Sequence, residues 1–274
     1  MKKYFIIGDP ISHSLSPKLH NYWFKKYKVD AKYSLLPIKE IEIEKTINDI
    51  KNDNIAGINV TLPYKRKVIP FLDKLINDAL ESNSVNTIYK NSKNEIVGEN
   101  TDVFGFQAGY LKEVIDSPLN NQKALIIGAG GVSPSIILAL EKSNIKKISL
   151  VNRTFEKSVF LKKQFKNIEI NKWDKIEDLM SHNDIIINAT SLGLKNGKEF
   201  NVGIENIKSS SIYIDTIYNP SETKMIKLLK NKGIKTFNGL DMFLYQGQKS
   251  FYLWNKINPE IENDLIETLQ KDIN

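Results

Sequence analysis

Ala124-Leu125-Ile126-Ile127-Gly128-Ala129-Gly130-Gly131-Val132-Ser133 is the stretch of sequence that decides the fold. Its first four residues are apolar and predict a buried strand, and a helical pattern follows as far as Glu141. In the turn between them, glycines let the backbone approach a pyrophosphate, and the helix N-terminus offers free N–H donors. Ser133 takes the third glycine position of G-x-G-x-x-G, so the fingerprint is incomplete. The context predicts a dinucleotide site, with a tight turn that binds nothing as the alternative.

Strand and helix patterns alternate on the C-terminal side of this turn. Strands are expected at Ile148–Val151, Asp184–Asn188 and Ile212–Thr216, with helices at 155–165 and 222–230. Strands that alternate with helices of this length are typical of a parallel, doubly wound sheet.

The region before residue 103 predicts a second α/β unit. Lys3–Ile7 predicts a strand, and Pro17 to Lys28 predicts a helix with Ser16 as its N-cap. Further elements are expected as strands at 32–36, 55–60, 85–89 and 95–98, the last two as partners, and as helices at 40–50 and 101–115.

The length of 274 residues exceeds one typical domain, so we expect two. The tail from Leu240 is helical except near Pro259 and is expected to return to the first region. The predicted fold class is therefore α/β with two domains. Residues 1–103 plus 241–274 would form one domain, and residues 104–240 the other.

Composition excludes several classes of function. The absence of cysteine excludes disulfides, thiol catalysis and Cys-zinc sites. His13, His20 and His182 lack metal-ligand spacing, so no metal is expected, and the first two are interpreted as structural hydrogen-bonding residues. The apolar run after Met1-Lys2-Lys3 is too short for a signal or a membrane span, which favours a cytoplasmic protein without membrane contact.

The formal net charge of +7 raises the question of nucleic-acid binding. The lysines are dispersed rather than gathered in one stretch, which argues against such a partner. A positive surface instead suits small anionic ligands. The sequence leaves open whether the chain is a monomer or a homodimer.

The segment Val151-Asn152-Arg153-Thr154 bears on the choice of cofactor. NAD sites usually place an acid about 20 residues past the glycines, and Asn152 stands there instead. A neutral Asn152 beside Arg153, with Lys157 shortly after, would attract a ribose 2′-phosphate. We therefore expect NADP rather than NAD; a solvated loop and helix face is the alternative for the two cations.

Four clusters of small polar residues follow predicted strands in the first region: 12–17, 59–65, 85–87 and 98–102. Ligands bind at the ends of strands in α/β sheets, although each cluster alone is more often a turn. Hydroxyls, amides, a lysine and a carboxylate suit a polyhydroxylated carboxylate substrate. If the protein moves a proton to or from such a substrate, Lys65 is a suitable donor and Asp102 a suitable partner to orient it. The opposite assignment, with Asp102 as the proton-transferring group, stays open. The alternative for Lys65 is a surface lysine at a helix start with no catalytic role.

These motifs, in this order, resemble the shikimate dehydrogenase family. The resemblance runs from residue 8 to about 254 and rests on the segments 8–21, 59–65, 85–87, 100–102, 128–133, 152–154, 188–193, 218–223 and 239–246. Five positions depart from the family pattern: Ser84, Glu99, Lys157, Thr216 and Asp241. Lys157 keeps the charge of a frequent arginine but loses its fork geometry, and Thr216 replaces a usual apolar residue near the nicotinamide.

The resemblance implies a fold of two domains with an inter-domain cleft. Residues 1–103 plus 241–274 would form a mixed α/β substrate-binding and catalytic domain, and residues 104–240 a Rossmann-type NADP-binding domain with a doubly wound parallel sheet.

The resemblance also implies a role for each matching residue. Ser14 and Ser16 would hold the substrate carboxylate, with Tyr218 near it, and Lys65 and Asp102 would be the catalytic pair. The ring hydroxyls would be bound by Asn59, Thr61, Asn86, Asp102 and Gln246. NADP would be bound by Gly128, Ala129, Gly130, Gly131, Val132, Asn152, Arg153, Thr154, Lys157, Thr190, Ser191, Thr216 and Gly239.

The implied activity is the reversible NADPH-dependent reduction of 3-dehydroshikimate to shikimate, a step of chorismate and aromatic amino-acid biosynthesis. One alternative is a quinate/shikimate dehydrogenase with relaxed cofactor use. Another is a non-catalytic sensor of NADP or a metabolite, against which the presence of both Lys65 and Asp102 argues.

Overall fold

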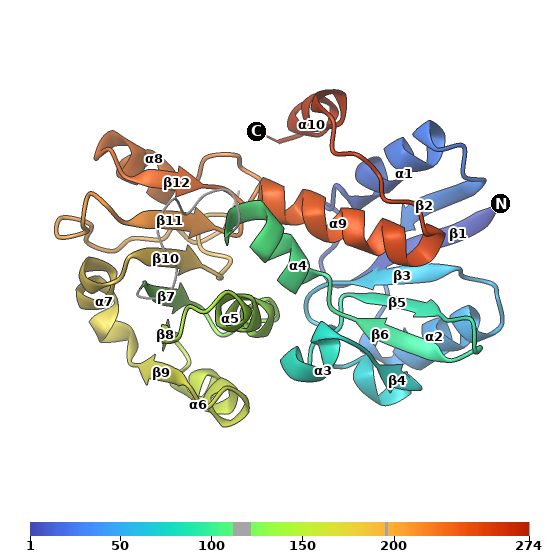
Figure 1. Cartoon of the computed structure of the whole chain (residues 1–274), viewed down its shortest axis with the longest axis horizontal. Coiled ribbons are helices and arrows are strands. Elements are labelled where there is room, and N and C mark those ends of the chain that lie inside the picture. Colours follow the sequence, from blue (N-terminus) through green and yellow to red (C-terminus); the bar gives the residue numbers. More distant parts are fainter. Residues whose placement is uncertain (112–121, 195–196, 274) are drawn as a thin grey trace. The chain divides into compact units, whose positions relative to one another are not determined.

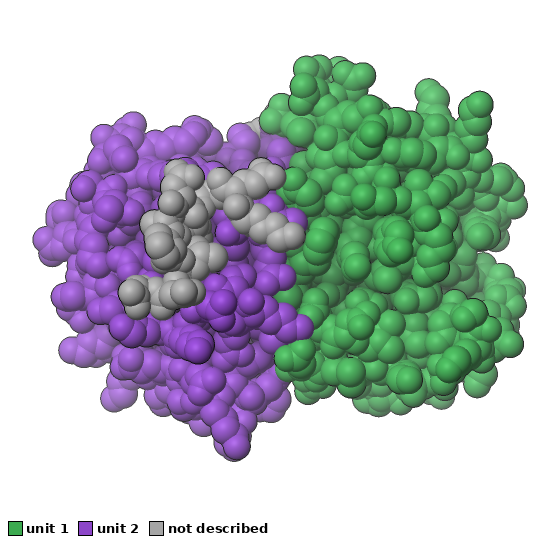
Figure 2. All heavy atoms as spheres, in the orientation of Figure 1, with its two compact units in different colours: residues 1–105, 244–272 green, residues 106–243, 273–274 purple. Residues whose placement is uncertain are grey.

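The computed structural model describes residues 1–111, 122–194 and 197–273. Contacts divide the chain into two compact units, which Figure 2 colours separately. Unit 1 comprises Met1–Gly105 and Leu244–Asp272, and unit 2 comprises Phe106–Phe243 with the C-terminal end. The C-terminal helices thus contribute to the unit that the N-terminus begins.

Among the described residues, unit 1 contains a six-stranded sheet in the order β2-β1-β3-β5-β6-β4 (Figure 1). β1 pairs in parallel with β2 and β3, whereas β5 pairs antiparallel with β3 and β6. The pairing of β5 with β6 was predicted. The strands are β1 (Lys2–Ile7), β2 (Ala31–Leu35), β3 (Gly57–Val60), β4 (Lys74–Leu75), β5 (Thr87–Lys90) and β6 (Ile96–Glu99). The sheet therefore contains both parallel and antiparallel strand pairs.

Helices cover this sheet and complete its core. Ile43 and Ile47 of α2 pack with Ile58 of β3 and Ile88 of β5, all of them buried. Burying such side chains stabilises the unit by about 1.5–3 kcal/mol each. The helices are α1 (Ser16–Lys26), α2 (Ile43–Lys51), α3 (Asp78–Ser82), α4 (Asp102–Phe106), α9 (Leu240–Asn255) and α10 (Asn263–Gln270).

The start of α1 differs from the prediction. Leu15 is the N-cap, so the assignment of Ser16 as N-cap is wrong. Ser16 lies in the first turn, where its backbone N–H donates to Ser14 Oγ at 3.3 Å. The Ser14 hydroxyl in turn donates to Ser16 Oγ at 3.1 Å. A serine two residues earlier therefore satisfies a helix-start N–H, and the Ser16 hydroxyl is left for other contacts.

His20 also differs from the prediction, because it is not held by hydrogen bonds. Both ring nitrogens are buried without a hydrogen-bond partner among the described residues. The ring instead stacks on Tyr33, with 4.5 Å between centroids, and lies edge-on to Trp23. Burial lowers the pKa of His20 to about 3. His20 is therefore a neutral member of an aromatic cluster.

The described part of unit 2 forms a parallel sheet in the order β12-β11-β10-β7-β8-β9. Counted along the chain from β7, this is the strand order 6-5-4-1-2-3 of a Rossmann fold. The strands are β7 (Lys123–Ile127), β8 (Lys147–Val151), β9 (Ile168–Asn171), β10 (Ile185–Asn188), β11 (Ile212–Asp215) and β12 (Lys235–Phe237). The predicted doubly wound parallel sheet is confirmed.

Helices cover both faces of this second sheet. Figure 1 shows α5 and α6 on one side and α7 and α8 on the other. Ile176 of α7 and Met225 of α8 pack in one buried cluster with Leu125 of β7. The bounds are α5 (Ser133–Lys142), α6 (Phe155–Gln164), α7 (Ile176–His182) and α8 (Lys224–Asn231).

Three further findings concern the helix at α4, membrane-spanning helices and metal sites. The predicted helix at 101–115 is observed as α4 followed by a π-helical turn, Gln107–Leu111, and its remainder lies outside the described residues. No helix within the described ranges has both the length and the apolar character needed to cross a membrane. The described residues also bring together no group of three or more His, Asp or Glu side chains suited to a metal ion.

Candidate functional site

Lys65 and Asp102 meet in unit 1, as the sequence predicts. Lys65 lies in the turn after β3, and Asp102 is the first residue of α4. Lys65 Nζ lies 2.5 Å from Asp102 Oδ2, with side chains 12% and 7% exposed. An ion pair this little exposed is weakly screened by salt. The pair is therefore largely shielded from solvent, although both side chains keep some access to it.

Asn86 fixes the other side of the carboxylate. Its Nδ2 donates to Asp102 Oδ1 at 2.9 Å, and its Oδ1 accepts from the Thr101 N–H at 2.8 Å. The same amide lies 3.4 Å from Gln246 Oε1 on α9. Three predicted site residues, Asn86, Asp102 and Gln246, thus share one hydrogen-bonded group with Lys65.

Asn59 is buried at the centre of a second hydrogen-bonded group. Its Oδ1 accepts from the Tyr33 hydroxyl at 2.8 Å, and its Nδ2 donates to the Asn86 carbonyl at 3.0 Å. The same Nδ2 also reaches Thr87 Oγ1 and Ser250 Oγ, each at 3.1 Å. Tyr33 and Ser250 were missed from the sequence, where neither stands in a polar cluster.

Ser14 and Ser16 connect to this group through Tyr33. Burial raises the pKa of the Tyr33 hydroxyl, and a hydrogen bond with the Ser16 side chain opposes that rise. Tyr33 also bonds Asn59, whose amide donates to the carbonyl of Asn86, the residue that holds Asp102. Thr61 follows β3 and lies close to Gly8, since a Cβ at Gly8 would collide with Thr61 Cγ2.

In unit 2, the glycine turn has the geometry of a phosphate cradle. Gly128 has φ +114°, and a Cβ there would lie 2.8 Å from the Ala189 carbonyl oxygen. At Gly130 a Cβ would meet only that oxygen, at 3.8 Å, so its outer face is open. Ser133 donates to the Gly128 carbonyl at 2.8 Å and accepts from the Gly130 N–H at 3.0 Å. The serine at the third glycine position therefore closes the turn.

The end of β8 supports this turn and presents positive charge. Asn152 Oδ1 accepts from the Ala129 N–H at 3.0 Å, and its Nδ2 donates to the Thr154 carbonyl at 2.7 Å. Arg153 and Lys157 are exposed beside it. Asn152 therefore connects the glycine turn to the end of β8. An open glycine cradle with exposed cations fits a dinucleotide that carries an extra phosphate.

The loops after β10, β11 and β12 hold most of the remaining predicted cofactor residues. Thr190 Oγ1 donates to Asn188 Oδ1 at 2.7 Å, and Thr216 Oγ1 donates to the Asn188 carbonyl at 2.9 Å. Gly239 lies against Thr216, where a side chain would collide with the Thr216 carbonyl. The Tyr218 ring packs on Phe243 with 4.8 Å between centroids. Ser191 is exposed, and Gly131 and Val132 are half-buried.

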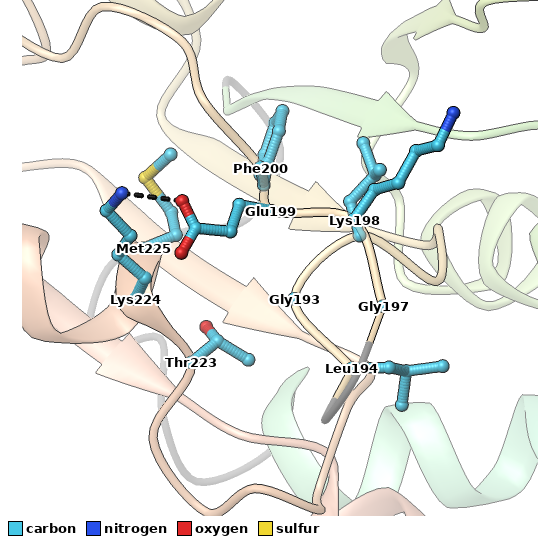
Figure 3. Close-up of a pocket in the computed structure, with 10 residues that line it drawn as sticks. Gly193, Leu194, Gly197, Lys198, Glu199, Phe200, Thr223, Lys224 and Met225 are labelled. Carbon is cyan, nitrogen blue, oxygen red and sulfur yellow. Dashed lines mark hydrogen bonds and ion pairs between the residues drawn. The ribbon is translucent and has the colours of Figure 1, made fainter.

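A separate hollow of about 220 Å³ lies in unit 2 (Figure 3). Lys224 and Glu199 point toward each other at its rim, 2.7 Å apart. Its described lining contains no residue predicted to bind cofactor or substrate, and consists of Leu192, Gly193, Leu194, Gly197, Lys198, Glu199, Phe200, Thr223, Lys224 and Met225.

The chain combines a Rossmann-type unit, which carries the glycine turn, with an α/β unit that holds a lysine–carboxylate pair. Together these features define a class of protein, the two-domain nicotinamide-dependent oxidoreductases. Comparison with known proteins narrows this class. Residues 6–88 match the model for the shikimate dehydrogenase substrate binding domain, and residues 111–231 match that for shikimate/quinate 5-dehydrogenase. The chain belongs to the shikimate dehydrogenase family.

Individual relatives resemble the chain over its full length. The shikimate dehydrogenase (NADP(+)) of Pelagibacter ubique is 50% identical over 98% of this chain and 99% of its own. A crystal structure of a shikimate dehydrogenase in complex with NADP+ has TM-score 0.91 and 30% identity, covering 100% of this chain and 96% of that one. The Thermus thermophilus enzyme in complex with NADP(H) and shikimate has TM-score 0.87 and 25% identity, covering 99% and 100%.

Proposed function

We propose that this chain is an NADP-dependent shikimate dehydrogenase that reversibly reduces 3-dehydroshikimate to shikimate. The observation that carries the proposal is the Lys65–Asp102 pair, 2.5 Å apart and bonded to Asn86. Relatives named as NADP-dependent shikimate dehydrogenases support it, as do solved relatives that hold NADP+ or shikimate. The reaction would serve chorismate and aromatic amino-acid biosynthesis.

Unit 1 would bind the substrate. Ser14 and Ser16 would receive the carboxylate, because their hydroxyls lie together at the start of α1. Thr61, Asn86 and Gln246 would receive ring hydroxyls. Asn59 and Asp102 would also receive ring hydroxyls, and the hydrogen bonds of Asn59 to Tyr33 and to the Asn86 carbonyl would hold it in place for that role. From unit 2, Tyr218 would contribute near the carboxylate.

Unit 2 would bind NADP. The pyrophosphate would lie on the turn Gly128–Val132, since Gly130 leaves room there. Arg153 and Lys157 would hold the 2′-phosphate, with Asn152 and Thr154 beside them. The nicotinamide half would be received by Thr190, Ser191, Thr216 and Gly239. We further propose a location in the cytoplasm and a monomer or homodimer. The lysines are dispersed along the sequence, which argues against a nucleic-acid partner.

The proton that the reduction needs would come from a residue of this chain, Lys65. NADPH, when bound, supplies the hydride. As the carbonyl π bond breaks, the Lys65 ammonium donates a proton to the developing alkoxide, and the hydroxyl forms. Lys65 is left as a neutral amine and regains its proton from solvent, to which its side chain keeps 12% exposure.

Asp102 would act on Lys65 rather than on the cofactor. Its Oδ2 accepts from Lys65 Nζ, and its Oδ1 is fixed by Asn86. A carboxylate anchored on both oxygens restricts where the lysine can point, which is the positioning that proton transfer requires. In the oxidation direction the same pair would accept the hydroxyl proton.

The test is a matrix of two substrates and two cofactors. Purified protein is mixed with shikimate or quinate and with NADP+ or NAD+, and absorbance in the reduced-nicotinamide band is followed. We expect the largest kcat/KM for shikimate with NADP+. A preference for quinate would favour the quinate dehydrogenase alternative. Tight NADP+ binding with no turnover of either substrate would contradict an enzymatic function and favour a sensor.

A further inference from the structure

Asp215, at the end of β11, is a fully buried carboxylate that the proposed mechanism does not use. Within the described residues, donors converge on both of its oxygens. Asn188 Nδ2 and the Ile217 N–H lie 3.1 Å from Oδ1, and Thr223 Oγ1 lies 3.0 Å from Oδ2. The Tyr213 hydroxyl is 3.4 Å from Oδ2. Burial raises the pKa of Asp215 to about 6. A set of donors alone suits the ionised carboxylate.

These bonds close the loop of residues 216–222 at both ends. Ile217 lies at the start of the loop, and Thr223 follows its last residue. Thr223 is also the N-cap of α8, where its Oγ1 accepts from the Ile226 N–H at 3.3 Å. Tyr218 and Thr216, which we assign to substrate and cofactor, lie on the loop that Asp215 thereby holds.

Asn188 extends the arrangement to the loop after β10. While its Nδ2 donates to Asp215, its Oδ1 accepts from the Thr190 N–H at 3.1 Å and from Thr190 Oγ1 at 2.7 Å. Its Nδ2 also donates to the Leu192 carbonyl at 3.1 Å. One carboxylate and one amide therefore join the two loops, and both side chains are buried where water cannot replace a lost bond.

The two halves of the dinucleotide site are supported by different groups. The adenosine side, at the end of β8, is supported by Asn152 through Ala129 and Thr154. In a sheet of this strand order the nicotinamide half extends across the glycine turn, over β10 and β11. That is the side on which Asp215 and Asn188 lie.

We propose that Asp215 is a positioning residue that, through Asn188 and Thr223, sets the loops after β10 and β11 in the geometry that receives the nicotinamide half of NADP. The inference rests on the proposed function, because that function assigns these loops to the cofactor. It adds a residue that touches neither cofactor nor substrate and acts through its neighbours.

The test compares two ligands on Asp215→Asn. NADPH spans the whole site, whereas adenosine 2′,5′-bisphosphate occupies only the adenosine side. We expect NADPH binding, followed by nicotinamide fluorescence, to weaken at least about ten-fold, since bonds to a charged group are lost. Calorimetry should show adenosine 2′,5′-bisphosphate binding within two-fold of wild type. NADPH affinity within two-fold of wild type would overturn the inference, as would an equal loss of both ligands.

A second set of variants decides the question if Asp215→Asn does not fold. Thr223→Val keeps the shape but removes the hydroxyl, and should show the same selective loss of NADPH affinity. Thr223→Ser keeps the hydroxyl and should bind NADPH more tightly than Thr223→Val. Thr236→Val is the matched control, because the Thr236 hydroxyl has no partner among the described residues. Equal NADPH binding by Thr223→Val and Thr236→Val would overturn the inference.

The activity assay and the two-ligand comparison together distinguish a failure of this inference from a failure of the proposed function. If wild-type protein binds NADPH but does not oxidise shikimate, the proposed function fails, while the ligand comparison still decides the role of Asp215. If wild type turns over and Asp215→Asn binds NADPH normally, the positioning role alone fails.

Discussion

His20 is a residue whose surroundings make the protein sensitive to acid. It stacks on Tyr33, whose hydroxyl holds Asn59, so the cluster and the candidate site share a side chain. Burial holds the His20 pKa near 3, against an ordinary value of 6.5. Between these values the unfolded chain binds a proton that the folded chain does not, so stability falls as pH falls.

We expect His20→Phe, which keeps an aromatic ring, to remove this sensitivity. At pH 4.5, two units below 6.5, the native protein should have lost about 3 kcal/mol of unfolding free energy relative to the variant, compared with pH 7. Urea denaturation of both proteins at the two pH values measures the difference. Parallel changes in the two proteins would show that His20 is protonated in the folded state.

Arg153 is the residue on which cofactor choice should depend. It is exposed at the end of β8, where the ribose of a bound dinucleotide would lie. We expect Arg153→Ser to raise KM for NADP+ by about 10-fold or more and to leave KM for NAD+ nearly unchanged, because charged hydrogen bonds to the 2′-phosphate are lost. Added salt should narrow the gap between variant and wild type.

The control for Arg153 lies at the other end of the same strand. Lys146 is exposed just before β8, so Lys146→Ser removes one charge from unit 2 far from the strand's carboxyl end. Steady-state kinetics should show wild-type KM values for both cofactors. An equal rise for NADP+ in the two variants would mean that net charge, and not Arg153, sets the preference.

At the scale of elements, the turn between β7 and α5 offers a matched pair of glycine substitutions. Gly128 has φ +114° and lies against the Ala189 carbonyl, whereas Gly130 is open on its outer face. Gly128→Ala should lower the thermal midpoint by several degrees, because the residue would be strained and crowded. Gly130→Ala should keep the wild-type midpoint but weaken NADPH binding, because its methyl group would occupy the pyrophosphate cradle. Scanning calorimetry with and without NADPH measures both; the reverse pattern would contradict the assigned geometry.

The same elements show what the sequence could predict. The strand, glycine turn and helix around Gly128 were predictable because apolar periodicity and turn chemistry are local signals. The edge strands β9 and β12 were missed because they are short and mix polar with apolar residues. The cap of α1 was misassigned to Ser16 because serine is a preferred N-cap residue, whereas the observed N-cap, Leu15, has no side chain that can cap a helix.

The candidate site was predictable in part for a similar reason. Lys65, Asn86 and Asp102 stand in polar clusters after strands, and the structure brings them together. Ser250 and Asn59 are 191 residues apart, so no local sequence pattern could predict that they contact each other. Asp215 ends an apolar strand and could not be told from a turn residue until its four donors were seen.

At the scale of the whole molecule, the two units should respond to different ligands. A ligand present at 100 times its Kd adds about 2.7 kcal/mol to the stability of the state that binds it. We expect shikimate to slow amide hydrogen exchange in 1–105 and 244–272, and adenosine 2′,5′-bisphosphate to slow it in 106–243. Mass spectrometry of peptide fragments measures both. Protection of unit 1 by the adenosine ligand alone would contradict the assignment of the units.

The measurement that bears most directly on the mechanism is kcat for shikimate oxidation by Lys65→Ala, beside Lys67→Ala. Lys67 is an exposed lysine two residues away, paired with Glu40 outside the candidate site. We predict that Lys65→Ala lowers kcat by about 10²–10⁴ with little change in KM, the usual size of general acid–base assistance, and that Lys67→Ala keeps the wild-type rate. A Lys65→Ala enzyme that keeps its kcat and loses only KM would contradict the account, since Lys65 would then bind substrate without moving a proton.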